Sequence, residues 1–231
     1  MGRREQYRAE LRALPNADWA PYLREHSGLP GPRGNLELAW AVAEEAGPER
    51  LDRLLATGEE YLVLCGTIGL GRLLAEGVEG AGERLRSYAR DARWRVREGV
   101  AMGLQRLGDA DLPRLLGLVT TWAGDPDPLV QRAAVAGICE PRLLKRPDAA
   151  ARAIGICERV TRELAARPPR ERKVDAVRTL RQALGYCWSV AVAADPGAGL
   201  PRFQALAAYD DPDVAWIARE NARKARLARL L

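Results

Sequence analysis

The sequence predicts an all-helical chain, arranged as a superhelix, or α-solenoid, of about five stacked helical hairpins. Three observations support this fold class. The chain is rich in Ala, Leu, Arg and Glu and contains a single Phe, so residues that favour strands are scarce. Apolar residues recur at the three- and four-residue spacing of a helix. Related segments also repeat along the chain, which is typical of stacked repeats.

The amino-terminal part, residues 1–80, is expected to form the atypical first hairpins. Helices are predicted over 35–45, 49–56 and 60–76, because Gly and Pro separate these segments. In CGTIGLGR, from Cys65, the three glycines match no nucleotide-binding motif and favour close helix packing. Before the first of these helices, GLPGPRGNLEL places Arg33 and several backbone amides where they can seat an anion. Alternatively, this segment is a rigid loop in which Asn35 caps the helix.

The clearer repeats lie in residues 81–231, where three segments share a helix–turn–helix pattern. Each has an aromatic residue, an aspartate in a short turn, and a valine that opens an Ala-rich helix bearing arginine. The turn aspartates are expected to cap the helix that follows; they are Asp91, Asp125 and Asp210. A degenerate copy between the second and third segments predicts helices over 149–165 and 172–194, with Trp188 in the core. We therefore expect one repeat domain spanning residues 1–231.

Composition limits the classes of partner and compartment. Lys and Arg (36) exceed Asp and Glu (31), a modest basic balance that is compatible with a polyanionic partner. The four cysteines are scattered among apolar helical segments, which indicates packed thiols in a cytoplasmic protein. With one histidine and no CxxC pair, the sequence predicts no metal site, and no motif indicates a cofactor. No apolar run is long enough to cross a membrane.

The second helices of the repeats resemble those of HEAT-repeat proteins. The segments that carry the resemblance are WRVREGVAMGLQRLG, LVQRAAVAGICEPRLL and DVAWIARENARKARL, which share the D-x-V-R and Ala/Leu-periodic pattern over about two thirds of the chain. The chain also looks like an uncharacterised bacterial family of HEAT-repeat proteins, through SGLPGPRGNLELA, CGTIGLGRLL and GYCWSVAVAA. These resemblances imply a fold and leave the function open.

A second resemblance is to the HEAT-like alkylpurine DNA glycosylases. In that family a Trp, followed four residues later by Asp, precedes by one repeat an Arg-Ala-rich helix that grips DNA phosphates. Here Trp94 is followed by Glu98 at the same offset, and Arg132 lies in QRAAVAG. The resemblance implies that Trp94 stacks on a cationic base while Glu98 stabilises positive charge on a sugar. The other interpretation is a packed Trp94, with Glu98 paired to Arg95 or Arg97.

Arginines recur on the predicted second helices, and a row of them on a concave face would contact nucleic-acid phosphates. Arg219, Arg223 and Arg226 are spaced so that one helix would present them on one face. The full set of candidates is Arg97, Arg132, Arg178, Arg181, Arg219, Arg223 and Arg226. We therefore expect a non-enzymatic module that binds DNA backbone. The alternatives are an alkylbase DNA glycosylase active in DNA repair, a scaffold that binds another protein, and, for the arginines, a merely solvated face.

Overall fold

The computed structural model describes residues 2–231, and these residues are all-helical, with no strand among them. The predicted fold class is confirmed at this level. Contacts between residues divide the chain into two compact units. Unit 1 ends at Ala110, and unit 2 comprises Asp111–Leu231.

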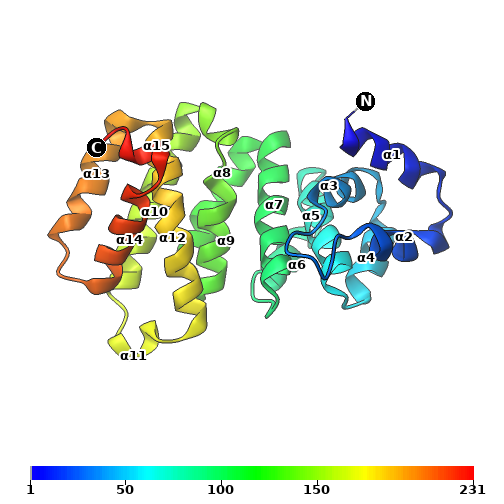
Figure 1. The fold of residues 1–231 in the computed structure, drawn as a ribbon, viewed down its shortest axis with the longest axis horizontal. Helices are drawn as coiled ribbons and strands as arrows, with labels where there is room; N and C mark the ends of the chain where they lie inside the picture. Colours follow the sequence, from blue (N-terminus) through cyan, green and yellow to red (C-terminus); the bar gives the residue numbers. More distant parts are fainter. Residues whose placement is uncertain (1) are drawn as a thin grey trace. The chain divides into compact units, whose positions relative to one another are not determined.

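Unit 1 is built on four helices that pack in succession, α1 on α3, α3 on α5 and α5 on α7, while α4 and α6 pack against α5 (Figure 1). The predicted helices in residues 35–76 are confirmed to within one residue at each end. The elements of unit 1 are α1 (Arg3–Ala13), η1 (Asn16–Asp18), α2 (Trp19–His26), α3 (Leu36–Glu45), α4 (Pro48–Ala56), α5 (Glu60–Ala75), α6 (Ala81–Tyr88) and α7 (Trp94–Ala110).

Helices α5 and α7 approach each other closely through glycines. A Cβ on Gly71 would overlap the backbone carbonyl of Gly103. A Cβ on Gly103 would in turn lie 2.8 Å from the carbonyl oxygen of Thr67. The expectation that the glycines of CGTIGLGR permit close helix packing is therefore confirmed at Gly71.

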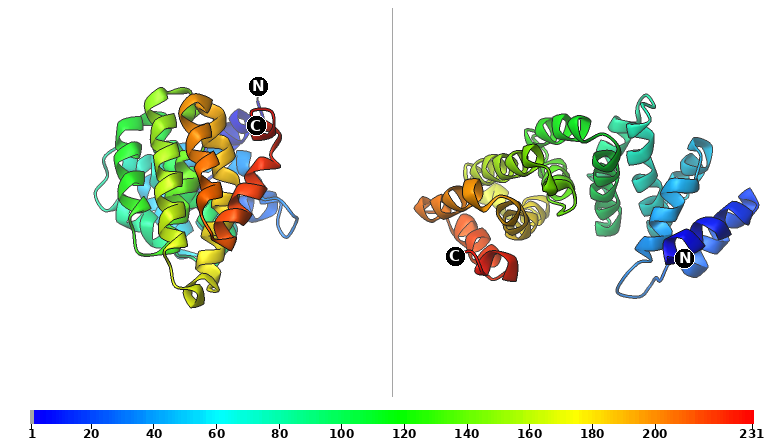
Figure 2. Two further views of the ribbon diagram at one scale, coloured as in Figure 1. Left: turned by 90° about the vertical axis from the view of Figure 1, so that its left-hand side faces the viewer. Right: turned by 90° about the horizontal axis from the view of Figure 1, so that it is seen from above.

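Unit 2 consists of two layers of helices. Helices α9, α12 and α14 pack side by side in one layer, and α8, α10 and α13 pack side by side in the other (Figure 2). Contacts between α8 and α9 and between α10 and α12 join the layers. The elements are α8 (Leu112–Ala123), α9 (Pro128–Ile138), η2 (Leu143–Lys145), α10 (Pro147–Ala165), α11 (Pro169–Arg172), α12 (Asp175–Ala194), α13 (Pro196–Gln204), η3 (Ala205–Ala208), α14 (Pro212–Ala222) and α15 (Ala225–Ala228).

The predicted apolar stripes form the cores of these units. Val96, Val100 and Leu104 of α7 have no exposed surface. Trp188 is likewise buried, and its indole Nε1 donates a hydrogen bond to Thr161 Oγ1 at 3.0 Å. Burying the indole costs little because its only donor has a partner.

Two of the three turn aspartates, Asp91 and Asp125, accept hydrogen bonds from backbone amides of their turns as expected. Asp91 accepts from the amide of Arg93 at 2.8 Å, and Asp125 accepts from the amide of Asp127 at 2.9 Å. The cap of α9, however, is Asp127 and not Asp125, since the Asp127 side chain accepts from the amide of Leu129 at 2.9 Å.

In the third turn, the prediction that Asp210 caps the following helix is wrong. Asp211 caps α14 instead, since its carboxylate accepts from the amides of Asp213 and Val214 at 3.0 and 3.1 Å. The sequence DDPD contains two adjacent candidate caps, Asp210 and Asp211, and the spacing of the repeats does not distinguish between them.

The carboxyl-terminal helix is shorter than the sequence predicts. α14 ends at Ala222, Lys224 has an extended backbone (φ −76°, ψ 125°), and α15 begins at Ala225. Arg226 is therefore on a different helix from Arg219 and Arg223. The expectation that one helix face presents all three arginines is wrong.

Candidate functional site

A hollow of unit 1, here called the unit-1 pocket, has a volume of about 1000 Å³. Its walls come from α1, α2, the loop between α2 and α3, the start of α3, and α7. The pocket brings together Arg33, Asn35, Trp94 and Glu98, which the sequence marked as two separate candidate sites. They lie about sixty residues apart in the chain, so only the fold unites them.

Asn35 organises the loop that forms one wall. Its side-chain oxygen accepts from the amide of Leu38 at 3.1 Å, so it is the amino-terminal cap of α3. Its side-chain amide donates to the hydroxyl of Tyr7 and to the carbonyl of His26, both at 2.9 Å. The expectation that Asn35 caps the helix that follows this loop is therefore confirmed.

Trp94 is the first residue of α7 and is 51% exposed, which is high for so large an apolar side chain. The interpretation of Trp94 as a packed residue is therefore wrong. The guanidinium of Arg95 lies over the indole at 4.6 Å from its centroid, and pairs with Glu60 at 3.2 Å. This contact supports one part of the ring and leaves the rest of it accessible.

Glu98 follows Trp94 by one helical turn and lines the same pocket. Two further carboxylates, Glu25 and Glu37, line the pocket as well. The pocket thus offers an aromatic surface and carboxylates, a combination that suits a flat ring carrying partial or full positive charge.

The pocket also contains Arg3 and Arg33. Neither arginine has a carboxylate within ion-pair distance among residues 2–231. Arg3 donates to the hydroxyl of Tyr7 at 3.2 Å, and Arg33 is exposed at the rim. Two arginines without acidic partners, close to an accessible indole, give the pocket the chemistry to hold an anionic group and an aromatic ring together.

Most of the arginines predicted to contact phosphate are engaged with the protein itself. Arg178 pairs with Asp175 at 3.4 Å, and Arg223 pairs with Glu220 at 2.8 Å. Arg181 pairs with Asp213 and packs on Trp216, at 4.8 Å from the ring centroid.

The remaining candidates differ in exposure and position. In unit 1, Arg97 donates to the backbone carbonyls of Asp91 and Ala92 and so secures the turn before α7. In unit 2, Arg132 is half-buried in α9. Arg219 is exposed and has no carboxylate partner among the described residues.

Other kinds of site have little support in the part of the chain that the structure describes. No three His, Cys, Asp or Glu side chains there gather into a group that could hold a metal ion. All four cysteines are buried free thiols, with Cys139 and Cys157 Sγ atoms 3.8 Å apart. Burial raises the pKa of the Cys65 thiol well above its usual range, so it is not a nucleophile. No helix within residues 2–231 has both the length and the apolar character to span a bilayer.

Sequence reasoning missed the contribution of α1 and α2 to the unit-1 pocket. Arg3, Tyr7 and His26 belong to segments without a repeat signature. Arg3 and Tyr7 reach the pocket through packing of α1 on α3, and His26 is the last residue of α2, which packs on α5. The only local signal was the Arg-rich start of the chain, which is also typical of a solvated helix.

No protein-family description matches the chain, and no curated protein matches it. Two solved structures, both titled as crystal structures of engineered proteins, are similar to it over their full lengths. One is 16% identical with a TM-score of 0.41, covering 100% of this chain and 99% of that chain. The other is 17% identical with a TM-score of 0.41, covering 100% and 97%. Similarity at this level supports no functional conclusion.

Proposed function

We propose that this protein is a helical-repeat module that binds nucleic acid, and that it holds an unstacked base in the unit-1 pocket. The base would stack on Trp94, and the neighbouring phosphates would pair with Arg3 and Arg33. The sequence-based expectation was contact with DNA backbone along a row of arginines. This proposal places the contact in one pocket of unit 1.

The observation that carries the proposal is the half-exposed indole of Trp94 beside two arginines that lack carboxylate partners among the described residues. Every base has a flat π-face, so an accessible indole binds bases with little regard to sequence. Phosphates supply the anion that an unpaired guanidinium lacks. A pocket of about 1000 Å³ is at the upper end of the sizes that bind small molecules, which leaves room for a base and its backbone.

Fluorescence anisotropy with a labelled single-stranded oligonucleotide at about 50 mM salt tests the proposal, because backbone contacts are strong there. Trp94→Ala is expected to weaken binding about 5- to 150-fold, the range for loss of one stacked base. Tyr209→Ala is the matched control, since Tyr209 is an exposed aromatic residue, 36% accessible, outside the pocket. Undetectable binding by the unmodified protein, or equal weakening by both substitutions, would contradict the proposal and favour a protein-binding scaffold.

A second candidate function is excision of alkylated bases by an enzyme resembling the HEAT-like alkylpurine glycosylases. It is favoured by the presence of Trp94 and Glu98 in one pocket. Alkylation makes a purine cationic, so it would gain from both the indole face and the carboxylate. In this proposal Glu98 stabilises positive charge as the bond between base and sugar breaks.

Release of 3-methyladenine or 7-methylguanine from methylated DNA measures this activity. Glu98→Gln keeps the size of the side chain and removes its charge, so release should fall by a factor of about 100 or more. Glu79→Gln, which removes an exposed carboxylate outside the pocket, is the control and should retain activity. No release by the unmodified protein, or unchanged release by Glu98→Gln, would exclude the proposed role.

We further propose that the helical pairs are HEAT-like repeats of one α-solenoid, in keeping with the sequence resemblance. The two-layer packing of α8, α10 and α13 against α9, α12 and α14 supports repeats within unit 2. In unit 1 the successive packing of α3, α5 and α7, with α4 and α6 against α5, supports the same architecture.

A further inference from the structure

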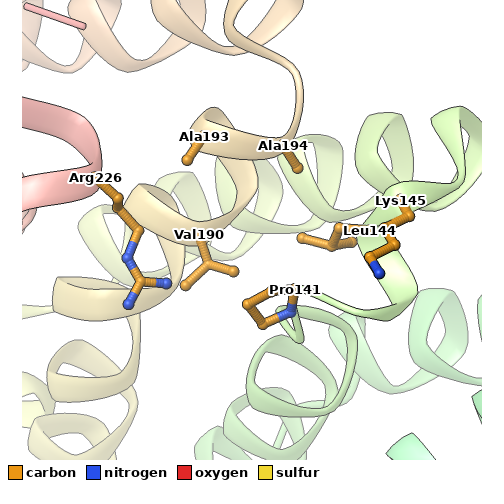
Figure 3. Close-up of a pocket in the computed structure, with 7 residues that line it drawn as sticks. All are labelled: Pro141, Leu144, Lys145, Val190, Ala193, Ala194 and Arg226. Atoms are coloured by element: carbon orange, nitrogen blue, oxygen red, sulfur yellow. The ribbon is translucent and has the colours of Figure 1, made fainter. Parts of the chain in front are cut away.

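A second pocket lies within unit 2, between the carboxyl-terminal end of α12 and the segment that joins α9 to α10 (Figure 3). We call it the unit-2 pocket. Its volume of about 540 Å³ falls within the range of pockets that bind small molecules. Leu144 and Val190, each only 3% exposed, form its floor. Pro141, Ala193 and Ala194 complete an apolar surface that favours an apolar ligand body.

The apolar surface continues along α12 beyond the pocket. Tyr186, Val190 and Ala193 are spaced at i, i+4 and i+7 and so share one face of the helix. Tyr186 is 44% exposed on that face. The floor is therefore part of an extended apolar stripe and is not an isolated gap between side chains.

Lys145 and Arg226 stand at opposite ends of the unit-2 pocket. Figure 3 shows the side chains of Val190, Leu144 and Pro141 between their nitrogen atoms. Among the described residues, no acidic side chain lines the pocket. Within residues 2–231, neither Lys145 nor Arg226 forms an ion pair with a carboxylate. Neither of them donates a hydrogen bond to the backbone carbonyls that end α12. These two cations are therefore available for a ligand.

The basic residues beside the pocket behave differently. Arg142 pairs with Glu140 at 3.1 Å, and Arg146 pairs with Asp148 at 3.4 Å. Arg142 and Arg146, which do not line the pocket, thus have acidic partners, whereas Lys145, which lines it, has none among the described residues.

Arg226 is held in a defined position. One of its terminal nitrogens donates to the hydroxyl of Tyr186 at 2.8 Å, and its guanidinium carbon lies 4.9 Å from the centroid of that ring. This support orients the guanidinium and leaves further N–H groups for an anion.

We propose that the unit-2 pocket binds a small molecule with an apolar middle and an anionic group at each end, such as a medium-chain α,ω-dicarboxylate. The middle would lie on Val190 and Leu144, and the two carboxylates would pair with Arg226 and Lys145. A molecule with one anionic end would leave the second cation beside its apolar tail, which is a poor match. A nucleobase would lack partners for its polar edge on this aliphatic floor. Binding of this ligand does not depend on the nucleic-acid binding that we propose for the unit-1 pocket.

Calorimetric titration of the full-length protein with dicarboxylates of six to ten carbons, at constant ionic strength, tests this proposal. Monocarboxylates of the same length are the reference. The best dicarboxylate is expected to bind about fivefold more tightly than its monocarboxylate, the gain from one more exposed ion pair. Affinity should rise with chain length, about fourfold for each added CH₂ that is buried, and peak where the chain spans the two cations.

Lys145→Gln is expected to abolish the advantage of the dicarboxylate and to leave monocarboxylate binding unchanged within about twofold. Lys173→Gln, which removes an exposed lysine outside the pocket, is the matched control and should keep the full advantage. Equal affinity for the two ligand classes in the unmodified protein would overturn the proposal. Equal losses in the two variants, or binding of an oligonucleotide at this pocket without binding of dicarboxylates, would also overturn it.

Discussion

At the scale of single residues, the buried amide of Asn221 joins two helices of unit 2. Its side-chain oxygen accepts from the amide of Ser189, and its nitrogen donates to the carbonyls of Leu184 and Ile217, all at 2.8 Å. The side chain has no exposed surface. Two of these three backbone groups belong to α12 and one belongs to its own helix, α14, so the side chain ties the two helices together.

Replacing Asn221 with Ala should destabilise the protein by about 2–4 kcal/mol, because buried backbone groups of α12 lose their partner. Urea denaturation measures the change. Asn16→Ala is the control, since Asn16 is exposed and should cost less than about 0.5 kcal/mol. Comparable losses in the two variants would show that the buried amide is not a special contact.

Glu45 makes the stability of unit 1 sensitive to acid. Hydrogen bonds from Arg12, at 2.8 and 2.7 Å, and from Arg8, at 2.6 Å, lower the pKa of its carboxyl from 4.5 to about 2. Because the folded-state pKa is the lower one, the stabilisation is complete above the ordinary pKa. It is lost as the pH falls toward the folded-state value.

Between about pH 5 and pH 2, the free energy of unfolding should therefore fall by about 1–2 kcal/mol more in the unmodified protein than in Glu45→Gln. The difference is this small because Arg12 is half-exposed and solvent weakens its ion pair with Glu45. Thermal unfolding at a series of pH values checks this difference. Parallel pH profiles for the two proteins would show that Glu45 is not responsible.

At the scale of elements, two glycines within helices have opposite roles. Gly71 of α5 faces the backbone of α7, where a Cβ would overlap the carbonyl of Gly103. A Cβ on Gly117 of α8 would meet no heavy atom within 4 Å. Conformational entropy favours Ala over Gly at both sites, but only the second has space for it.

Gly71→Ala is therefore expected to destabilise the protein by about 1–3 kcal/mol, because the two helices must separate. Gly117→Ala should stabilise it by about 0.5–1 kcal/mol. Chemical denaturation of both variants checks the signs. Stabilisation by Gly71→Ala would mean that α5 and α7 do not approach as closely as described.

Helix boundaries were predictable where local chemistry marks them. Gly and Pro bound α4 and α5, and Asn35 caps α3, so these helices follow from the sequence. The break between α14 and α15 was missed because apolar and basic spacing continues through Lys224. Nothing in composition there marks the extended backbone at that residue.

At the scale of the whole molecule, the candidate site depends on packing between distant segments. Asn35 and Trp94 were each recognisable from the sequence, one by its position before a helix and the other by its offset from Glu98. Tyr7 was not, since its contact with Asn35 spans 28 residues and exists only because α1 packs on α3. Arginines with similar sequence surroundings also differ in whether the fold places a carboxylate within ion-pair distance of them.

Net charge and stacking should contribute separately to nucleic-acid binding. The formal net charge of +5 attracts a polyanion regardless of the pocket. Trp94→Ala is therefore expected to lower affinity by the same factor at low and high salt. Replacing both Arg3 and Arg33 with Gln should flatten the plot of log affinity against log salt by about 1.4, or about 0.7 for each phosphate contact. Titrations at several salt concentrations measure both effects; a Trp94→Ala effect that vanishes at high salt would contradict this separation.

The most direct test of base binding in the unit-1 pocket is to locate a bound base on the protein. Photo-crosslinking with a single-stranded oligonucleotide that carries 5-iodouracil, followed by mass spectrometry of the digested full-length protein, identifies the aromatic residue that touches the base. We predict a crosslink at Trp94 that disappears in Trp94→Ala. Crosslinks confined to aromatic residues of unit 2, or no crosslink under conditions where the oligonucleotide is bound, would contradict base binding at Trp94.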